Sequence, residues 1–157
     1  MSEFEIVEIT GREPGKLWEQ LWHIDQNCFS PAIAYSGLEI RAYLNHPRGA
    51  HWMARLPSNE IAGFLLSAQV RDRGHIITVD VLAEHRGTGM GSALMRTAED
   101  HFCRCGARDL RLEVAVTNDV ALRFYQRLGF AVTRTLPGYY AGELDGLRME
   151  KSLAPML

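Results

Sequence analysis

Three alternating glycines form the part of this sequence best suited to bind a charged ligand. Gly87, Gly89 and Gly91 lie between a strand pattern that ends near Leu82 and a helix pattern that begins at once. Glycine lets the backbone approach a ligand closely, and the free N–H groups at a helix start point towards it. The helix dipole adds positive potential at the same place. The spacing therefore predicts an anion-binding turn, with Arg86 supplying a formal charge at its mouth.

Two common phosphate-binding motifs do not match this turn. A dinucleotide fingerprint would need a further glycine at position 92 or 94, where Ser92 and Leu94 stand. A P-loop starting at Gly87 would need Gly-Lys at 92–93, where the sequence has Ser-Ala. The remaining pattern is Arg-x-x-Gly-x-Gly over 86–91. A turn that needs only positive φ values is the alternative, but the neighbouring arginine and helix start favour a ligand.

A second set of spaced residues follows at 110–130. It comprises L-E-V around Glu113, N-x-x-A from Asn118, and F-Y-x-x-L-G-F around Tyr125. Together with the glycine turn, this set resembles the GNAT superfamily of N-acetyltransferases, whose acyl-CoA pyrophosphate loop has the same glycine pattern. Segments 138–140 and 147–151 resemble the closing segments of bacterial ribosomal-protein-alanine N-acetyltransferases. The resemblance covers residues 76–151, roughly half of the chain.

The resemblance implies that acetyl-CoA is the acyl donor and that no metal is needed. It implies a mixed sheet splayed between a strand at 76–82 and a strand at 108–116, with pantetheine paired to the backbone of Val79 and Val81. Asn118 matches a family position that contacts the cofactor, although a helix N-cap explains it equally well. The pyrophosphate would bind the backbone amides of Arg86, Gly87, Thr88, Gly89, Met90 and Gly91.

The resemblance also implies catalytic roles for Glu113 as general base and Tyr125 as general acid. A carboxylate with an ordinary pKa of about 4.3 is a weak base, so Glu113 would need burial or a relaying water. A phenol with a pKa of about 10 is a weaker acid than a thiol at about 8.5, so a hydrogen bond to the developing thiolate is expected of Tyr125. The alternatives are a solvent-facing glutamate and a core tyrosine. A backbone N–H near Val81 is the expected oxyanion donor, and transfer should be direct within a ternary complex.

The acceptor site is expected between the loop 29–35 and the last hairpin, with Tyr35, Tyr139 and Tyr140 lining it. Tyr139 and Tyr140 could instead be an aromatic strand pair. The loop lacks the tryptophan of the alanine acetyltransferases, and Gly138 stands where asparagine is common.

The leading hypothesis for the acceptor is a protein N-terminal α-amine. At pH 7 roughly 10% of such an amine is neutral, against roughly 0.04% of a lysine side chain, so it needs less help from a base. A small amine such as a polyamine, an amino acid or a drug is the second hypothesis. A non-catalytic acetyl-CoA-binding module is the third.

The elements that must position these residues fit one domain over 1–157. Apolar residues make up 46% of the chain and charged residues 23%. The expected order is β-α-α-β-β-β-α-β-α-β-β, a mixed α/β fold of about seven strands and four helices. Capping-box spacings at Thr10–Glu13 and Ser36–Glu39 predict the starts of the first two helices. Strand patterns cover 4–9, 51–56, 61–70, 75–82, 108–116, 130–136 and 147–152, and later helix patterns cover 89–105 and 118–128.

The formal net charge of −2 argues against a nucleic-acid-binding surface, and the charge is uneven. Residues 86–134 carry eight basic and five acidic residues, in the half expected to meet the phosphates of acetyl-CoA. The start of the chain lacks the features of a signal peptide, and no apolar run is long enough to span a membrane. With three cysteines, these features predict a cytoplasmic protein that acts as a monomer or homodimer away from membranes.

Overall fold

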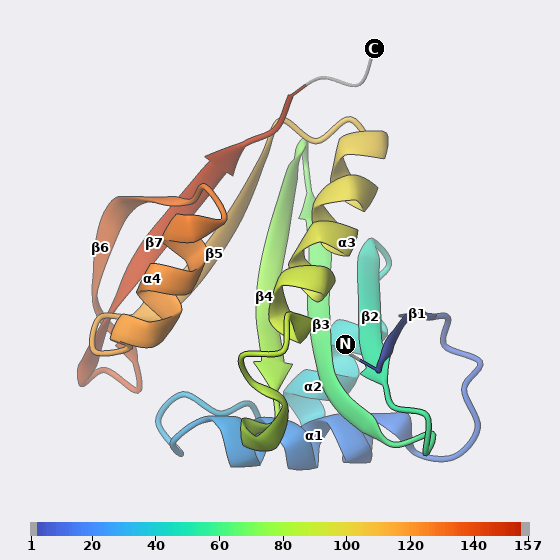
Figure 1. The fold of residues 1–157 in the computed structure, drawn as a ribbon. Helices are drawn as coiled ribbons and strands as arrows, with labels where there is room; N and C mark the ends of the chain where they lie inside the picture. The colour runs from blue at the N-terminus through green and yellow to red at the C-terminus, as the bar shows by residue number, and fades with distance from the viewer. Residues whose placement is uncertain (1–2, 155–157) are drawn as a thin grey trace.

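The computed structural model describes residues 3–154 and places their seven strands in one sheet, in the order β1-β2-β3-β4-β5-β7-β6 (Figure 1). Four α-helices and one short 3-10 helix join them, so the predicted α/β class and element order are confirmed. The domain prediction over 1–157 includes residues 1–2 and 155–157, which lie outside the described residues. The strands are β1 (Glu5–Ile9), β2 (Gly49–Arg55), β3 (Ile61–Val70), β4 (Arg73–Val81), β5 (Asp109–Ala115), β6 (Ala131–Tyr140) and β7 (Leu144–Ser152). The helices are α1 (Leu17–Cys28), α2 (Gly37–Leu44), η1 (Ala83–His85), α3 (Met90–Arg104) and α4 (Asp119–Arg127).

The sheet opens between β4 and β5, the only neighbouring strands of residues 3–154 that run parallel. The pairing joins Arg73, Gly74 and His75 to 109–111 and goes no further along the described strands. Beyond His75 the two strands diverge, and Figure 1 shows the resulting V, closed near the start of both strands. The predicted splay is therefore confirmed.

One extra residue in β4 decides which side chains face each side of the open arm. The β3–β4 register shifts at Ile77, which has no partner on β3. Residues opposite one another on antiparallel strands share a face. Thr78 and Asp80 stand opposite β3 residues that pack under α1 and α2, whereas Val79 and Val81 pack with α3. The bulge thus sends a threonine and an aspartate towards the first two helices.

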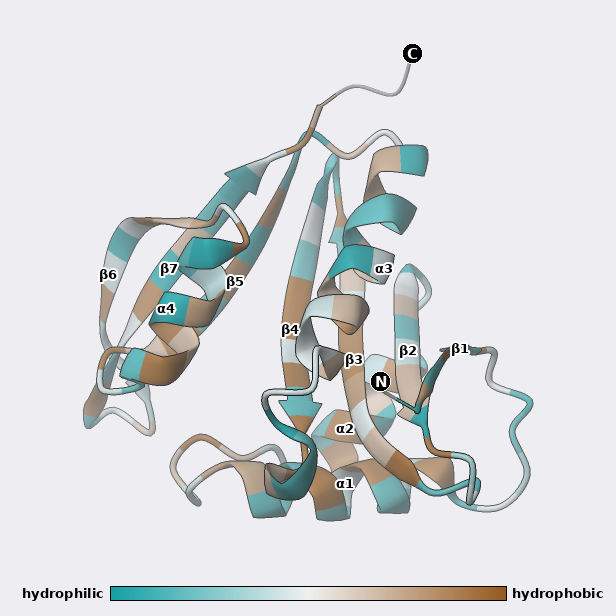
Figure 2. Ribbon diagram, in the orientation of Figure 1, coloured by the Kyte–Doolittle hydropathy of each residue, from teal (hydrophilic) through white to brown (hydrophobic). Residues whose placement is uncertain are grey.

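Two apolar clusters hold the layers together, one on each face of the sheet. α3 and α4 pack on one face, where Leu65 and Phe102 are fully buried. α1 and α2 pack on the other face, where Leu21, Ile40 and Phe64 are fully buried. Figure 2 shows hydrophobic colour along much of β3, an inner strand of the sheet whose side chains belong to both clusters.

The first helix begins later than the sequence indicates. Thr10 and Glu13 do contact one another, because the Glu13 carboxylate accepts hydrogen bonds from the Thr10 N–H at 2.7 Å and the Gly11 N–H at 2.9 Å. These contacts close a separate turn. The helix starts at Leu17 because Gly15, with φ of +76°, interrupts the helical path. The prediction that this capping box opens the helix was wrong.

The other predicted boundaries need smaller changes. The capping box of Ser36 and Glu39 is present in both directions and opens α2, as predicted. The last hairpin is longer than predicted, because β6 continues to Tyr140 through a register shift around Gly138, which has φ of +61°. Within 3–154 no helix combines the length and apolar character needed to cross a membrane.

Candidate active site

The arms of the V, α4, the loop 29–35 and the last hairpin enclose a cavity of about 670 Å³. Twelve of the fourteen residues predicted to form the site line it, and Thr88 and Met90 do not. The cavity thus brings together segments from most of the chain. The lining residues among those predicted are Tyr35, Val79, Val81, Arg86, Gly87, Gly89, Gly91, Glu113, Asn118, Tyr125, Tyr139 and Tyr140.

The glycines of the turn serve two different purposes. Gly87 and Gly89 have φ of +76° and +88°, which side-chain-bearing residues rarely adopt, and Gly89 is the N-cap of α3. Gly91 is instead needed for space, because a Cβ there would lie 3.3 Å from the ring of Phe124. The turn therefore exposes backbone at the start of α3, and Gly91 lets α4 approach closely.

The two predicted turn residues outside the lining face elsewhere. The Met90 side chain is 1% exposed and belongs to the core under α3. The Thr88 hydroxyl donates a hydrogen bond to the His85 carbonyl at 2.6 Å. Only their backbone groups remain available to a cofactor, which agrees with a site built from amides.

The Arg86 side chain braces the turn. Its Nε donates a hydrogen bond to the Val81 carbonyl at 2.9 Å, and the Cys28 thiol lies 3.5 Å from the same oxygen. The guanidinium therefore anchors the turn to the end of β4, a contact that the sequence did not indicate.

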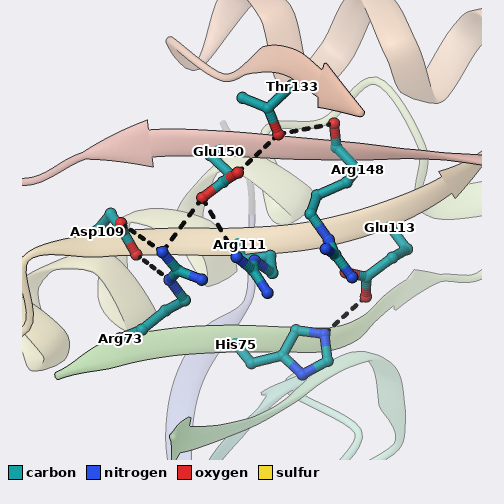
Figure 3. Close-up of polar contacts among 8 residues, drawn as sticks. All are labelled: Arg73, His75, Asp109, Arg111, Glu113, Thr133, Arg148 and Glu150. Atoms are coloured by element: carbon teal, nitrogen blue, oxygen red, sulfur yellow. Dashed lines mark hydrogen bonds and ion pairs between the residues drawn. The ribbon is translucent and has the colours of Figure 1, made fainter. Parts of the chain in front are cut away.

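Glu113 is buried, with its side chain 8% exposed, and its carboxylate contacts His75 and Arg148 (Figure 3). One oxygen lies 2.7 Å from His75 Nε2 and the other 3.4 Å from Arg148 Nε. Burial raises the pKa of Glu113, but the hydrogen bond to His75 and the charge of Arg148 outweigh it, so the pKa lies below its ordinary value. The solvent-facing alternative is excluded. Direct proton transfer to Glu113 was expected to need burial that makes the carboxylate a stronger base. Burial does not have this net effect here, because the pKa of Glu113 is lowered.

A second group of ion pairs clamps the closed end of the V. Arg73 on β4 bonds Asp109 on β5 at 2.6 Å, and Glu150 on β7 lies 3.5 Å from Arg73 and 3.6 Å from Arg111 (Figure 3). These side chains are partly exposed, so each pair contributes little stability alone. Together they join three strands at the place where β4 and β5 still pair.

Tyr125 extends from α4 and packs edge-on against Phe130, with ring centroids 6.0 Å apart. Burial raises the pKa of Tyr125 above its ordinary value. The phenol therefore stays protonated and can donate a hydrogen bond. Asn118 caps α4, because its Oδ1 accepts a hydrogen bond from the Ala121 N–H at 3.1 Å, and it also lines the cavity. Its two proposed roles are thus compatible.

Tyrosines from two distant segments line the part of the cavity where the acceptor is expected to bind. The Tyr35 hydroxyl donates a hydrogen bond to the Ile77 carbonyl at 3.2 Å, next to the bulge of β4. The rings of Tyr139 and Tyr140 contact each other edge-on, with their centroids 4.9 Å apart, and both residues line the cavity. They are therefore an aromatic pair and lining residues at once.

Sequence reasoning missed the partners of Glu113. His75 had no partner at ligand spacing along the chain, yet the short β4–β5 ladder places it 2.7 Å from Glu113. Arg148 stands directly opposite Glu113 on β7. A pairing register was the missing information, and no local motif carries it.

Comparisons with known proteins agree with this architecture. The sequence model of the Acetyltransferase (GNAT) family matches residues 18–130. An uncharacterised N-acetyltransferase of Methanocaldococcus jannaschii is 37% identical over 92 residues, which are 58% of this chain and 59% of that protein. The catalytic subunit of the N-terminal acetyltransferase B complex of Arabidopsis thaliana is 31% identical over 107 residues, which are 65% of this chain and 62% of that protein. The chain thus spans about half to three fifths of the curated relatives it matches.

The fold has close counterparts among solved structures. The ribosomal-protein-S18-alanine N-acetyltransferase of Escherichia coli superposes with a TM-score of 0.84 at 21% identity, covering 98% of this chain and 96% of that one. At this identity the likeness concerns the fold alone. The family match extends over most of the chain and includes the glycine turn, the split strands and Glu113. The chain therefore belongs to the acetyltransferase (GNAT) family.

Proposed function

We propose that this protein transfers the acetyl group of acetyl-CoA to the α-amine of a protein N-terminus. The observation that carries the proposal is a single cavity that joins the glycine turn to Glu113 and Tyr125 at the opening of the sheet. Membership of the GNAT family supports acetyl transfer. Relatives named as N-terminal acetyltransferases support the choice of acceptor.

The donor binds along the open edge of β4. Beyond His75 this edge has no partner strand on β5, so the backbone around Val79 and Val81, apart from the Val81 carbonyl that Arg86 contacts, is available to the amides of pantetheine. The pyrophosphate then reaches the N–H groups at 86–91, where the dipole of the fifteen-residue helix α3 adds positive potential. The acetyl group is left near the centre of the V.

The acceptor nitrogen attacks the thioester carbon, forming the C–N bond while the C–S bond breaks. The proton lost from nitrogen passes to the Glu113 carboxylate directly or through water, and His75 and Arg148 hold that carboxylate in place. The Tyr125 hydroxyl donates a hydrogen bond to the departing thiolate. A base of lowered pKa suits an α-amine better than a lysine, because far more of the α-amine is already neutral at pH 7.

The charge of the cavity favours a peptide over a polyamine. Its lining contains two carboxylates, Asp80 and Glu113, and two guanidinium groups, Arg86 and Arg127. A polyamine site would need an excess of negative charge, which this lining lacks. The three cysteines are free thiols, which supports the proposal of a cytoplasmic enzyme, monomeric or homodimeric.

Acetyl-CoA turnover against short peptides with varied first residues tests the proposal, with spermidine and free amino acids run alongside. We expect transfer to at least one peptide, located by mass spectrometry on the N-terminal nitrogen. The same peptide with a blocked N-terminus and a free lysine is the matched control and should not react. Preferred transfer to spermidine or an amino acid would favour the small-amine alternative. Turnover with no acceptor, despite acetyl-CoA binding, would favour a non-catalytic module.

A further inference from the structure

Two buried carboxyl groups meet beside the acceptor side of the cavity, and the proposed chemistry does not use them. Asp25 on α1 is 0% exposed and Asp80 on β4 is 1% exposed. The bulge at Ile77 turns Asp80 towards α1, which crosses near the end of β4 in Figure 1. We refer to Asp25 and Asp80 as the carboxyl pair.

In each residue of the carboxyl pair, one carboxyl oxygen accepts a hydrogen bond from a neighbouring group and the other does not. Asp25 Oδ2 accepts the Tyr35 N–H at 2.7 Å, and Asp80 Oδ1 accepts the Thr78 hydroxyl at 2.5 Å. Asp25 Oδ1 and Asp80 Oδ2 are buried and receive no hydrogen bond from any other group of residues 3–154. Two ionised carboxylates here would repel and leave both oxygens unsatisfied, which is costly in a buried site. One proton between them satisfies both.

The shift towards the protonated form is larger at Asp80 than at Asp25. Burial and the hydrogen bond to Asp25 raise the pKa of Asp80 well above its ordinary value, and burial also raises the pKa of Asp25. Thr78 and the cation of Arg86 oppose the shift at Asp80 but do not cancel it. The aspartates of other proteins that share a proton behave in the same way.

Ionisable groups from each neighbouring element face the carboxyl pair. They are Cys28 on α1, Glu39 on α2, Tyr35 in the loop, Arg86 in the glycine turn and Tyr125 on α4. Arg86 is the one cation among these five groups. The Cys28 thiol is neutral as well, because burial raises its pKa to about 11. Loss of the shared proton would therefore leave two negative charges in contact.

The carboxyl pair joins three parts of the acceptor side. Asp25 holds the Tyr35 N–H, and the adjacent Gln26 side chain holds the Tyr35 carbonyl at 2.8 Å. The Tyr35 hydroxyl bonds the Ile77 carbonyl of β4. Through Asp80, the same cluster connects α1 to β4. The position of the Tyr35 ring in the cavity thus depends on contacts that the shared proton maintains.

We propose that the proton shared by Asp25 and Asp80 is a latch that holds Tyr35 and the loop 29–35 in place to receive the acceptor. Both aspartates are positioning residues in this role, which rests on the proposed function. A group that binds its proton more tightly when folded loses its contribution as pH rises through its folded pKa. The latch is therefore closed while the pair keeps its proton and opens as pH rises through the raised pKa, which weakens acceptor binding and leaves acetyl-CoA binding unchanged.

The first test does not depend on activity. We expect the carboxyl carbons of Asp25 and Asp80, followed by NMR, to titrate as a coupled pair that retains one proton at neutral pH. Two independent titrations near the ordinary aspartate value of about 3.9 would overturn the proposal. Hydrogen exchange of the Tyr35 amide should accelerate at least about tenfold in Asp80→Ala, because Asp25, the acceptor of this amide, then loses the partner that fixes it to β4. Asp100→Asn, an exposed change on α3, is the matched control and should leave this exchange unchanged.

The conservative variant Asp80→Asn distinguishes the loss of the shared proton from the loss of the hydrogen bond between residues 25 and 80. Its amide can donate to Asp25 but cannot ionise, so protection of the Tyr35 amide should persist at alkaline pH, where the wild type loses it. Equal loss of protection in the wild type and Asp80→Asn would overturn the latch. This comparison remains decisive if Asp80→Ala does not fold.

The kinetic test uses the best peptide acceptor. Asp80→Ala should raise the KM for peptide about tenfold, while the Kd for acetyl-CoA stays within about twofold and Asp80→Asn restores the KM. An unchanged peptide KM in Asp80→Ala would contradict the positioning role. If the wild type acetylated no peptide, the proposed function would fail and so would this role, whereas the titration and exchange results would still decide whether the latch exists.

Discussion

The two sides of the cavity are built by different means. The donor side is mostly backbone from one continuous segment, in which the open edge of β4 leads directly into the glycine turn and α3. The acceptor side is mostly side chains from segments far apart in the chain, including Tyr35, Glu113 and Tyr139. A backbone site depends on conformation, whereas a side-chain site depends on hydrogen bonds and charges between elements. Variants of the two sides should therefore fail in different ways.

Tyr125 should show the largest effect, because it stands where the two sides meet. Removing its hydroxyl in Tyr125→Phe deprives the leaving thiolate of a hydrogen bond without altering the backbone that binds the cofactor. We expect kcat to fall about a hundredfold, while the Kd for acetyl-CoA changes by less than about twofold. Steady-state kinetics and calorimetric titration measure the two quantities. Equal losses in turnover and affinity would show that the two sides are not separable here.

Glu113→Gln should have the next largest effect, confined to the acceptor side. We expect kcat/KM for peptide to fall about thirtyfold at pH 7, and the pH of half-maximal activity to rise, because the reaction then relies on amine that is already neutral. A pH–rate profile measures both. A parallel loss at every pH would assign Glu113 to acceptor binding instead.

The same variant has a signature in stability. Because the fold lowers the pKa of Glu113, the stabilisation from its ionised form is complete above about pH 4.3 and is lost as pH falls through the lowered pKa. Glu113→Gln lacks this dependence. The difference in free energy of unfolding between the two proteins should thus shrink below about pH 4, as measured by denaturant titration. A difference that grows on acidification would contradict the ion pairs with His75 and Arg148.

Gly89→Ala tests the donor side. The residue has φ of +88° with open space around its Cβ position, so the substitution adds backbone strain of about 1–2 kcal/mol without a clash. We expect the Kd for acetyl-CoA to rise about tenfold while peptide KM is unaffected. Gly106→Ala is a matched control, because Gly106 has φ of +77° and equally open space at the far end of α3. Equal losses of cofactor affinity in both variants would indicate a general effect of stability.

Ser36→Ala should give the smallest effect, on the framework of the acceptor side. It removes half of the capping box of α2, which should cost about 1 kcal/mol and lower Tm by about 2–4 °C. Acetyl-CoA affinity should be unchanged. Ser58→Ala, which removes a 3.4 Å contact in an exposed turn, is the control and should leave Tm almost unaltered. A Tm loss as large for Ser58→Ala would remove the special role of the cap.

The difference between the two sides also explains what the sequence could predict. Gly87, Gly89 and Asn118 are local signals of turns and helix starts, and the structure has them where expected. The start of α1 was misplaced because the spacing of Thr10 and Glu13 fits a closed turn as well as a helix cap.

The partners of the acidic residues depend on tertiary structure. Glu113 could be read as an alternating strand residue, but the direction of its pKa shift comes from His75 on β4 and Arg148 on β7. Asp80 stands between two valines near the end of β4, and only the bulge at Ile77 and the burial of Asp25 give it a partner. Pairing registers and bulges carry this information, and neither is visible in a local motif.

Addition of acetyl-CoA to the isotopically labelled protein, followed by amide NMR, tests the central claim most directly. We expect the amide signals of Val79, Val81 and the glycine turn at 86–91 to change on binding. Signals around the surface hollow of Trp18 and Trp22 should stay in place, because that hollow lies outside the cavity. Changes confined to that hollow or elsewhere, with the amides of 79–91 unmoved, would contradict the claim that the split between β4 and β5 is the donor site.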